Sequence, residues 1–405
     1  MNTSALRPAV PLLVLIIAGC IIAAIGNGVR TSFGLFTLPM TADLGLSREG
    51  WGMAMAIQNL AWGVAQPFAG AYADRVGTGR TIALGAAVYA LGVLGMAFSP
   101  DAGIMTLTAG IVTGTGIAIC SFSVVMAAFG RAVPVEKRSM IFGVATAASS
   151  FGQFAFAPIS QGFINAFGWQ SALLYLAMAL LLIIPLSYAL RGRTENPVGQ
   201  ADLPFMQTLA QAWGHGSYRL LVVGFFVCGF HLAFINVHMP AYLVQCGLSP
   251  AVGSWAIAVI GLFNIVGSLL AGYLGGRLPK QMLLAAIYFS RAVAIGLFLI
   301  FPVSELTAYT FAAAMGVLWL STVPLTAGLV GLFFGARYLG MLYGIAFFSH
   351  QLGSFVGVWL GGYIYDLTGS YSLVWYLGIM LGLASAALHL PINERAAPRF
   401  IPKPA

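Results

Sequence analysis

The sequence predicts an all-α membrane protein with twelve transmembrane helices, arranged as two six-helix bundles related by pseudo-twofold symmetry. Three observations predict this fold class. Of the 405 residues, 60% are hydrophobic and 7% are charged, and the mean hydropathy is +0.93, whereas soluble domains are only about 45–50% apolar. The apolar residues form twelve long stretches, and short motifs recur about half a chain apart.

Each apolar stretch is long enough to cross a membrane. The apolar core of a bilayer is about 30 Å thick and takes roughly 20 helical residues to span. Because this core offers no water to backbone polar groups, we expect helices at every crossing. The expected helices lie near residues 10–38, 48–72, 80–99, 103–130, 139–167, 169–190, 217–244, 250–275, 281–301, 304–333, 340–366 and 371–392.

Recurring motifs divide these helices into two equal sets. The tripeptide "GLS" occurs at residues 45–47 and again at 247–249, an offset of 202 residues. Gly152 and Gly168 match Gly353 and Gly369 at an offset of 201. Matches spread along the whole half predict a duplicated unit, and an even number of helices per unit makes the two copies parallel. We expect an N-terminal bundle over residues 1–190, a polar linker over 191–216 and a C-terminal bundle over 217–405.

The basic residues predict the orientation of the chain. If both termini are cytoplasmic, fifteen of the eighteen Lys and Arg residues lie on the cytoplasmic side, as the positive-inside rule requires. The net charge of +8 is then a topology signal that also favours anionic lipid headgroups, and it indicates no nucleic-acid partner. We expect a monomer in the plasma membrane, specifically the bacterial inner membrane.

A charged hairpin follows the second helix, with the sequence "GAYADRVGTGR" at residues 70–80. A duplicated six-plus-six helical chain with G-x-x-x-D-R-x-G at this place resembles the major facilitator superfamily. The residues that carry the resemblance, together with a trailing cation, are Gly70, Asp74, Arg75, Gly77 and Arg80.

The resemblance implies that this hairpin latches the cytoplasmic face when the transporter is open to the outside. Asp74 is then expected to face the N-terminal end of helix eleven near Gly340 and to be able to pair with Arg131 at the end of helix four. The second copy, "GYLGGRLPK" at residues 272–280, has Gly276 at the position of Asp74. It therefore lacks the charge contact. A loop that only sets topology is the alternative interpretation.

Ionisable residues at membrane depth are costly, so they are candidate functional residues. All ten acidic residues fall in loops or at helix ends, whereas two arginines and three histidines fall within the expected helices. A buried charge needs a partner, and the missing partner of a cationic interior is an anionic substrate. The intramembrane basic residues are Arg30, Arg291, His231, His238 and His350.

Arg30 on helix one is the principal candidate for binding this anion. Asn27 and Arg30 share a helix face, and a guanidinium group binds a carboxylate in a bidentate manner. His231 and His238 share a face of helix seven and are expected to bind the anion or a coupled proton. A satisfied packing histidine is the alternative at both positions, and an arginine bonded to helix carbonyls is the alternative for Arg30.

Further candidates come from both halves of the chain. Tyr343 and His350 lie on one face of helix eleven, and Gln153 lies on its repeat partner, helix five, so the two helices predict a site at the repeat interface. Arg291, Asn59 and Asn264 on helices nine, two and eight complete the candidate set. Hydroxyl and amide groups in membrane helices often serve only to hold helices together.

These residues favour a secondary transporter of a small organic anion, working by exchange or with H⁺ as coupling ion. Within the superfamily, the acid-free core and the intramembrane arginine resemble the monocarboxylate and oxalate–formate porters. The alternative is proton-coupled movement of a neutral or amphiphilic solute, as in drug exporters, whose usual buried carboxylate is missing from this sequence. We expect no cofactor and no metal site, and no nucleophile–base pair indicates an enzyme.

Overall fold

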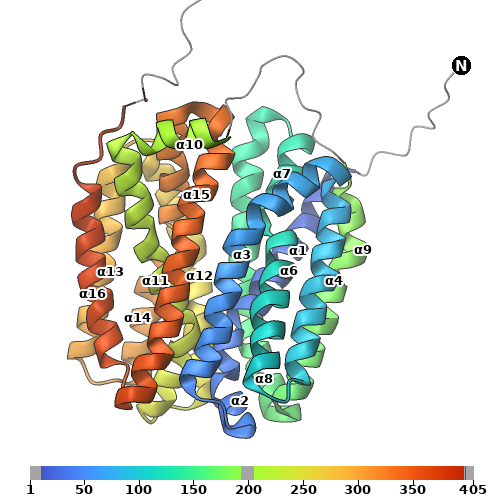
Figure 1. Cartoon of the computed structure of the whole chain (residues 1–405), viewed down its shortest axis with the longest axis vertical. Coiled ribbons are helices and arrows are strands. Elements are labelled where there is room, and N and C mark those ends of the chain that lie inside the picture. Colours follow the sequence, from blue (N-terminus) through green and yellow to red (C-terminus); the bar gives the residue numbers. More distant parts are fainter. Residues whose placement is uncertain (1–10, 193–204, 396, 398–405) are drawn as a thin grey trace, which may run out of the picture.

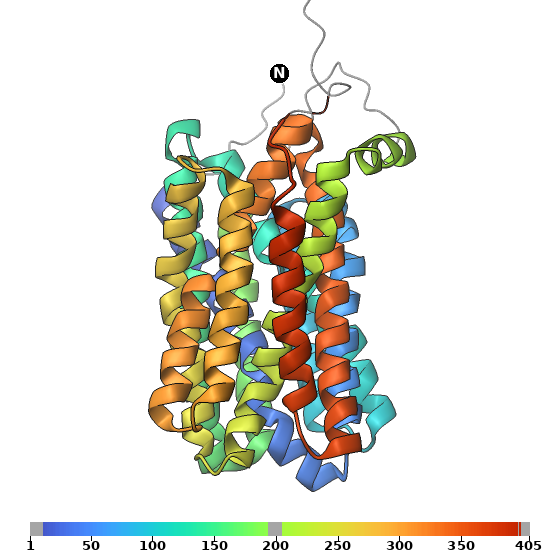
Figure 2. The same cartoon turned by 90° about the vertical axis from the view of Figure 1, so that its left-hand side faces the viewer.

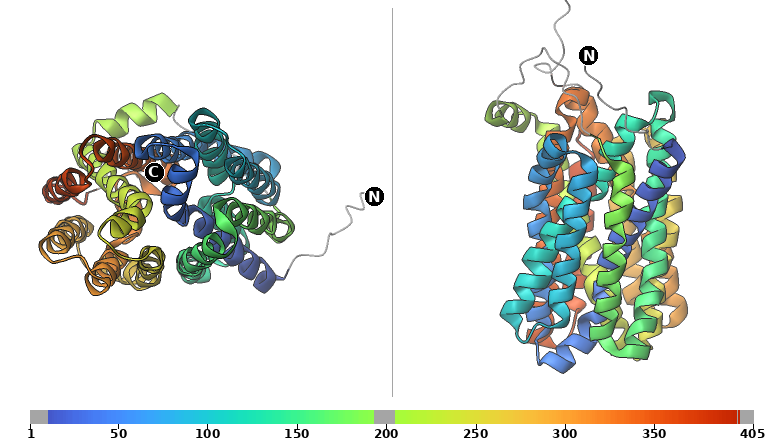
Figure 3. Two further views of the ribbon diagram at one scale, coloured as in Figure 1. Left: turned by 90° about the horizontal axis from the view of Figure 1, so that it is seen from below. Right: turned by 90° about the vertical axis from the view of Figure 1, so that its right-hand side faces the viewer.

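The structure is a computed structural model that describes residues 11–192, 205–395 and 397, with the backbone alone described at residues 135, 136, 138, 139, 205, 336 and 337. Residues 193–204 of the predicted linker therefore lie outside the described residues, and its later part contains a short helix, given below. The described part is helical throughout its two halves (Figure 1). Figure 3 shows, in its end view, that the two halves form separate groups of helices side by side.

The first half begins with a crossing that is divided into three pieces. Its pieces are α1 (Leu12–Thr31), the 3₁₀-helix η1 (Phe33–Phe36) and α2 (Thr37–Leu44). Next come α3 (Arg48–Val76) and α4 (Thr78–Ala97). The fourth crossing consists of α5 (Ala102–Met105), the π-helix η2 (Thr106–Val112), α6 (Thr113–Ile119) and α7 (Phe122–Ala132). The half ends with α8 (Val135–Leu181), α9 (Ile183–Ser187) and the 3₁₀-helix η3 (Tyr188–Leu190).

The second half repeats this order after a short helix, α10 (Phe205–Trp213). Its crossings begin with α11 (Gly216–Gln245), α12 (Pro250–Gly275) and α13 (Lys280–Ile300). They continue with α14 (Glu305–Leu318), α15 (Thr322–Thr368) and α16 (Ser372–His389). Figure 2 shows the outer side of this C-terminal bundle, with α16 in red.

The predicted twelve crossings are confirmed. Ten described segments are long and apolar enough to span a membrane. One of them, Met140–Leu190, contains two crossings, because α8 reverses at Gly168, where φ is 79°. The remaining crossing is the more polar α3. Similarly, α15 reverses at Gly335 (φ 76°) and contributes to two crossings. Only glycine adopts such positive φ values at little cost.

The repeated motifs form equivalent structures in the two halves. Gly45 and Gly247 of the two "GLS" copies both have positive φ, 62° and 88°, and the serines that follow are the N-caps of α3 and α12. A Cβ on Gly152 would lie 2.0 Å from the Ala24 carbonyl oxygen, and one on Gly353 would lie 1.9 Å from the Phe226 oxygen. Both glycines therefore permit the same close helix approach, α8 on α1 and α15 on α11.

The start of α1, the end of α16 and the whole of α10 lie at one end of the bundle, at the top of Figure 1. We call this end the terminal end, and the opposite end, which carries α2, the distal end. The positive-inside pattern predicts that the terminal end faces the cytoplasm. The two bundles contact each other mainly where α3 packs along α15 and where α8 packs along α12.

Candidate functional site

Arg30 lies near the middle of the first crossing, in the last turn of α1, one residue before Thr31 ends the helix. Its guanidinium lies over the indole ring of Trp62, 5.0 Å from the ring centroid. In the described part of the chain, no hydrogen-bond acceptor and no carboxylate is paired with this guanidinium. Arg30 is therefore an intramembrane cation. Among the described residues, its guanidinium makes a cation–π contact with Trp62 and no ion pair.

Arg30 lines a small cavity of about 60 Å³ inside the N-terminal bundle. Such a volume holds a few water molecules or the charged end of a small ligand. The cavity is built from α1, α3, α4, the fourth crossing and α8, and its polar or aromatic lining residues are Asn27, Arg30, Trp62, Tyr89, Ser121, Phe122 and Ser149.

The polar walls of this cavity are held by hydrogen bonds. Asn27 donates from Nδ2 to the Ser149 carbonyl, 3.0 Å away, which joins α1 to α8. Trp62 donates from Nε1 to Gln66 at 2.8 Å, and Gln66 donates in turn to the hydroxyls of Ser121 and Ser123. This chain of bonds fixes the indole face on which Arg30 rests.

The fourth crossing is broken beside this cavity. α6 ends at Ile119, and α7 starts at Phe122 after Ser121, whose backbone is extended (φ −66°, ψ 155°). The side chain of Ser121 does not cap α7, because its hydroxyl bonds to Gln66 and Ser123 instead. Ser121 and Phe122 both line the cavity. The Val124 N–H donates to the Ser121 carbonyl at 3.0 Å, and among the described contacts the N–H groups of Phe122 and Ser123 have no acceptor. The N-terminus of α7, with its positive dipole end, therefore lies at the cavity that Arg30 lines.

The C-terminal bundle faces this region with aromatic side chains of α15. Phe347 meets Trp62 edge to face, with ring centroids 5.2 Å apart, and His350 stacks on Phe347 at 5.7 Å. His350 also lies against Phe225, and its Nδ1 is 3.0 Å from Gln351 Oε1. Tyr343, two turns before His350 on α15, also packs near Phe225. The predicted residues His350 and Tyr343 thus lie on an aromatic wall opposite Trp62.

Three predicted residues join the two bundles. The Asn59 carbonyl accepts from Gln351 Nε2 (3.1 Å) between α3 and α15. Gln153 donates to the Ile257 carbonyl (3.3 Å) between α8 and α12. Asn264 donates to Ser150 Oγ (2.9 Å) across the same pair of helices. These groups lie at the bundle interface, outside the cavity of Arg30.

His231 and His238 of α11 do not line this cavity. His231 is buried and donates from Nε2 to the Gly378 carbonyl of α16, 2.7 Å away. His238 is buried and donates to the Val358 carbonyl of α15, 2.8 Å away. A cavity-lining position was expected because helix seven is the repeat partner of helix one. The structure instead places both rings in helix packing, so we leave them out of the site proposed below.

Arg291 of α13 is also separate from the cavity. It is completely buried and donates from Nη2 to the Leu318 and Trp319 carbonyls, each at 2.6 Å. These carbonyls end α14, where the tenth crossing is broken before α15 begins. Its Cζ lies 5.3 Å from the Tyr288 ring centroid. Arg291 thus supplies hydrogen-bond donors to the backbone carbonyls at this helix break inside the C-terminal bundle.

The distal end is closed by contacts between the bundles. Asp366, at the distal end of α15, accepts from the backbone N–H groups of Arg48 (3.1 Å) and Glu49 (2.6 Å), the first residues of α3. The Arg48 guanidinium donates to the Tyr371 hydroxyl at 2.7 Å. Burial raises the pKa of Tyr371 to about 12, so this hydroxyl stays protonated at neutral pH. We call Arg48, Glu49, Asp366 and Tyr371 the distal gate.

The predicted latch hairpin lies at the terminal end. Asp74, Arg75 and Arg80 are exposed, and Gly77 has a φ of 97° between α3 and α4. Asp74 acts electrostatically on Arg131, and Arg131 donates to the Thr78 hydroxyl at 2.6 Å. A Cβ on Gly70 or on Gly340 would meet no atom within 4 Å. In this state, with the distal gate closed, the hairpin is not packed tightly on Gly340, and the latch stays a prediction.

The sequence did not single out Trp62, Gln66 and Ser121. Trp62 and Gln66 lie four residues apart on one helix face, next in line to Asn59, and this spacing was the available signal. The helix break at Cys120–Ser121 could not be predicted from the sequence, because neither residue is a glycine or a proline, the usual helix breakers.

Comparison with known proteins assigns the family. Residues 15–358 match the model of the Major Facilitator Superfamily. Among the relatives, the Uncharacterized MFS-type transporter YcxA of Bacillus subtilis (strain 168) is 27% identical, with 91% of this chain and 92% of that protein covered. Monocarboxylate transporter 13 of Rattus norvegicus is 24% identical, with coverages of 86% and 81%.

Solved structures agree with this fold. The D-xylose-proton symporter superposes with a TM-score of 0.73 at 15% identity, covering 94% of this chain and 97% of that chain. A bacterial homologue of the human lysosomal transporter Spinster, in an inward-facing and unoccupied conformation, gives 0.68 at 13% identity, with coverages of 93% and 94%. The chain is therefore a transporter, not an enzyme, and it belongs to the Major Facilitator Superfamily.

Proposed function

We propose that this transporter carries a small organic anion of the mono- or dicarboxylate type, whose carboxylate binds between Arg30 and the first turn of α7. One observation carries the proposal. Arg30 shares its cavity with an uncapped helix N-terminus, and the described residues supply no carboxylate to pair with it. Two positive groups thus converge on one space.

The physical argument concerns what each class of substrate would do there. Taking a guanidinium out of water is costly unless an anion or several acceptors compensate it. A carboxylate accepts from the guanidinium fork and from helix N–H groups in charge-assisted hydrogen bonds. A cationic substrate would be repelled, and a neutral one would leave the charge of Arg30 uncompensated. A carboxylate therefore fits this cavity best.

The remaining walls suggest how specificity and transport arise. Trp62 supports the guanidinium from one side, Asn27 and Ser121 line the same cavity, and Gln66 donates to the Ser121 hydroxyl from behind. The lining of the cavity comes from the N-terminal bundle, and the opposite bundle reaches it through Trp62, which Phe347 contacts with His350 stacked behind it. Rocking of the two bundles would then expose this site to each side in turn. The names of the relatives that are monocarboxylate transporters support the same substrate class.

A ligand screen on the purified protein tests the proposal. The wild-type chain and Arg30→Gln are heated with small mono- and dicarboxylates, with neutral sugars and with cationic drugs. Ligand binding to the folded state raises Tm with ligand concentration over Kd. We expect carboxylates to raise the Tm of the wild type and to leave that of Arg30→Gln unchanged.

Arg48→Gln is the matched control, because it removes the same charge at the distal end. It should keep the carboxylate response. Stabilisation of the wild type by neutral or cationic solutes, with none by carboxylates, would contradict the proposal and favour the neutral or amphiphilic alternative.

A further inference from the structure

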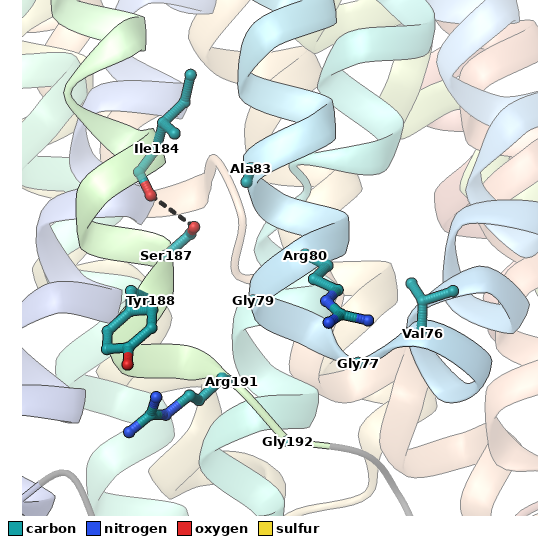
Figure 4. Close-up of a pocket in the computed structure, with 10 residues that line it drawn as sticks. All are labelled: Val76, Gly77, Gly79, Arg80, Ala83, Ile184, Ser187, Tyr188, Arg191 and Gly192. Carbon is teal, nitrogen blue, oxygen red and sulfur yellow. Dashed lines mark hydrogen bonds between the residues drawn. The ribbon is translucent and has the colours of Figure 1, made fainter.

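The cavity of Arg30 differs from a larger cavity of the molecule in how its walls are held. The larger cavity, of about 560 Å³, lies at the terminal end between α4 and the α9–η3 segment (Figure 4). The hydrogen bond drawn there runs from the Ser187 hydroxyl to the Ile184 carbonyl at 2.7 Å, within a single helix. Beside the cavity of Arg30, hydrogen bonds join α3 to the fourth crossing, and they come from Gln66, which does not itself line the cavity.

Ser121 has the backbone of a helix-capping residue but does not cap α7. Its φ and ψ are −66° and 155°, and those of Ser47 before α3 are −68° and 162°. The Ser47 hydroxyl accepts from the Gly50 N–H at 2.9 Å and caps its helix, as serine at this position ordinarily does. The backbone of Ser121 is therefore ready to cap α7, and the difference between the two serines lies in the partner of the hydroxyl.

Gln66 is the partner that the Ser121 hydroxyl has instead. Gln66 Nε2 donates to Ser121 Oγ at 3.0 Å and to Ser123 Oγ at 2.7 Å, and the two hydroxyl oxygens are 2.8 Å apart. Ser121 is buried, and a buried hydroxyl needs a hydrogen-bond partner. Ser249, which also precedes its helix without capping it, is exposed, so solvent can serve its hydroxyl. At Ser121 the alternatives are the Gln66 amide and the N–H groups of α7.

The indole of Trp62 fixes the orientation of this amide. Trp62 Nε1 donates to Gln66 Oε1 at 2.8 Å. Because an indole N–H can only donate, it selects the amide oxygen and turns the amide nitrogen toward the two serines. The same indole ring carries the Arg30 guanidinium, 5.0 Å from its centroid. Gln66 thus connects the ring that supports Arg30 with the residue that begins α7.

A serine cap and a bound carboxylate compete for the same donors. An N-cap side chain accepts from the second or third N–H group of a helix, and in α7 the second residue is Ser123. Among the described contacts, the Ser123 N–H has no acceptor. A carboxylate at this helix N-terminus would have to displace a cap whose hydrogen bond is worth roughly a fivefold factor in an equilibrium constant.

We propose that Gln66 is a positioning residue, which holds the Ser121 hydroxyl away from α7 and so keeps the Ser123 N–H available to the carboxylate of the substrate. The proposal rests on the anion site proposed above, but the position of the Ser121 hydroxyl is a property of the ligand-free protein. Without the Gln66 amide, this hydroxyl turns onto the Ser123 N–H and caps α7. Gln66 therefore controls anion affinity from outside the cavity.

Hydrogen exchange of the Ser123 amide in the ligand-free, full-length protein tests the first step. Ser123 is exposed, so solvent reaches this part of the helix. Gln66→Met keeps the length of the side chain and removes its amide, and we expect Ser123 exchange to slow by roughly fivefold as the cap forms. Gln66→Met/Ser121→Ala should restore the exchange rate of the wild type, because alanine cannot cap. Gln58→Met is the matched control, since Gln58 also donates from α3 to the fourth crossing, at the Ala109 carbonyl (2.8 Å), but does not contact Ser121.

Binding of lactate and succinate to the same variants tests the second step. Gln66→Met should bind roughly fivefold more weakly than the wild type, and Gln66→Met/Ser121→Ala should bind more tightly than Gln66→Met. Recovery on removing a second polar group is a result that a merely structural role of Gln66 would not give. Unchanged Ser123 exchange in Gln66→Met, or no recovery of binding in the double variant, overturns the proposal. Slowed exchange in a protein whose wild type binds neither acid would reject the anion site and support only the control of the Ser121 hydroxyl by Gln66.

Discussion

The two bundles each contain a broken helix at mid-depth, and the backbone groups at the two breaks differ in their hydrogen-bond partners. In the C-terminal bundle, Arg291 donates to the last carbonyls of α14, and Asn264 accepts from the Leu320 N–H. In the N-terminal bundle, the break between α6 and α7 opens on a cavity, and the Ser121 side chain leaves α7 uncapped.

The difference lies largely in the neighbouring helix. Tyr89, which lies 202 residues before Arg291, lines the cavity of Arg30 instead of filling the break. The C-terminal break is thus closed by the protein's own cation, whereas the N-terminal break leaves room beside a cation. Duplicated halves can keep one helix break as a structural element and leave the other available to a ligand.

The largest expected effect comes from Arg30. We predict that Arg30→Gln lowers uptake of the carried anion into proteoliposomes by about 30-fold or more, since removing one partner of a buried charge pair costs roughly 2–5 kcal/mol. The Tm of the ligand-free protein should not fall, because the described residues give Arg30 no anionic partner to lose. Undiminished uptake by this variant would remove Arg30 from the site.

Arg291 should show the opposite behaviour. We predict that Arg291→Met lowers Tm, because each carbonyl left without a donor costs about 1–3 kcal/mol, and both Leu318 and Trp319 would lose theirs. Anion affinity of the protein that remains folded should stay close to that of the wild type. Thermal unfolding and equilibrium binding on the same samples measure both quantities. Lost affinity at an unchanged Tm would mean that the two arginines share one role.

The N-terminus of α7 can be tested without removing a charge. Phe122 is the first residue of α7, where proline is tolerated, and Ser121 already has the extended backbone that precedes proline. Phe122→Pro removes a backbone N–H, whereas Phe122→Ala removes the same ring and keeps the N–H. Because a hydrogen bond to a charged group is worth about 1.5–3 kcal/mol, we predict at least roughly tenfold weaker anion binding by Phe122→Pro than by Phe122→Ala. Equal binding by both variants would exclude this N–H from the site.

The sequence predicted the fold far better than the site. Hydropathy and the repeated "GLS" and glycine positions gave all twelve crossings, because these features depend on local pattern and on backbone conformation. The charge census and helix spacing also predicted Arg30 and Asn27, which line the small cavity, and their role in binding stays a prediction. The same reasoning predicted His231 and His238, whose rings lie in helix packing, since a helical face shows which residues share a side but not which neighbouring helix that side meets. The carbonyls of Gly378 and Val358 that accept their hydrogen bonds come from helices more than a hundred residues away.

Asp366 offers the smallest predicted effect and the closest internal comparison for α7. It is a protein carboxylate on the N–H groups that begin α3, the arrangement proposed for the substrate on α7. Asp366→Asn keeps one acceptor but loses the charge, and such a charge at a helix N-terminus contributes about 0.3–1 kcal/mol. We therefore predict a shift of up to roughly fivefold toward states with the distal end open, measured by distances between spin labels across that end.

Asp43→Asn is the matched control for this shift. Asp43 also lies at the distal end and accepts from Trp169 Nε1 at 2.5 Å, but both residues belong to the N-terminal bundle. Loss of that bond should lower stability without changing the balance between open and closed states, because the bundles do not separate across it. If Asp43→Asn opened the distal end as much as Asp366→Asn, the carboxylate on α3 would not be what holds the gate. The analogy with an anion on α7 would then lose its support within the chain.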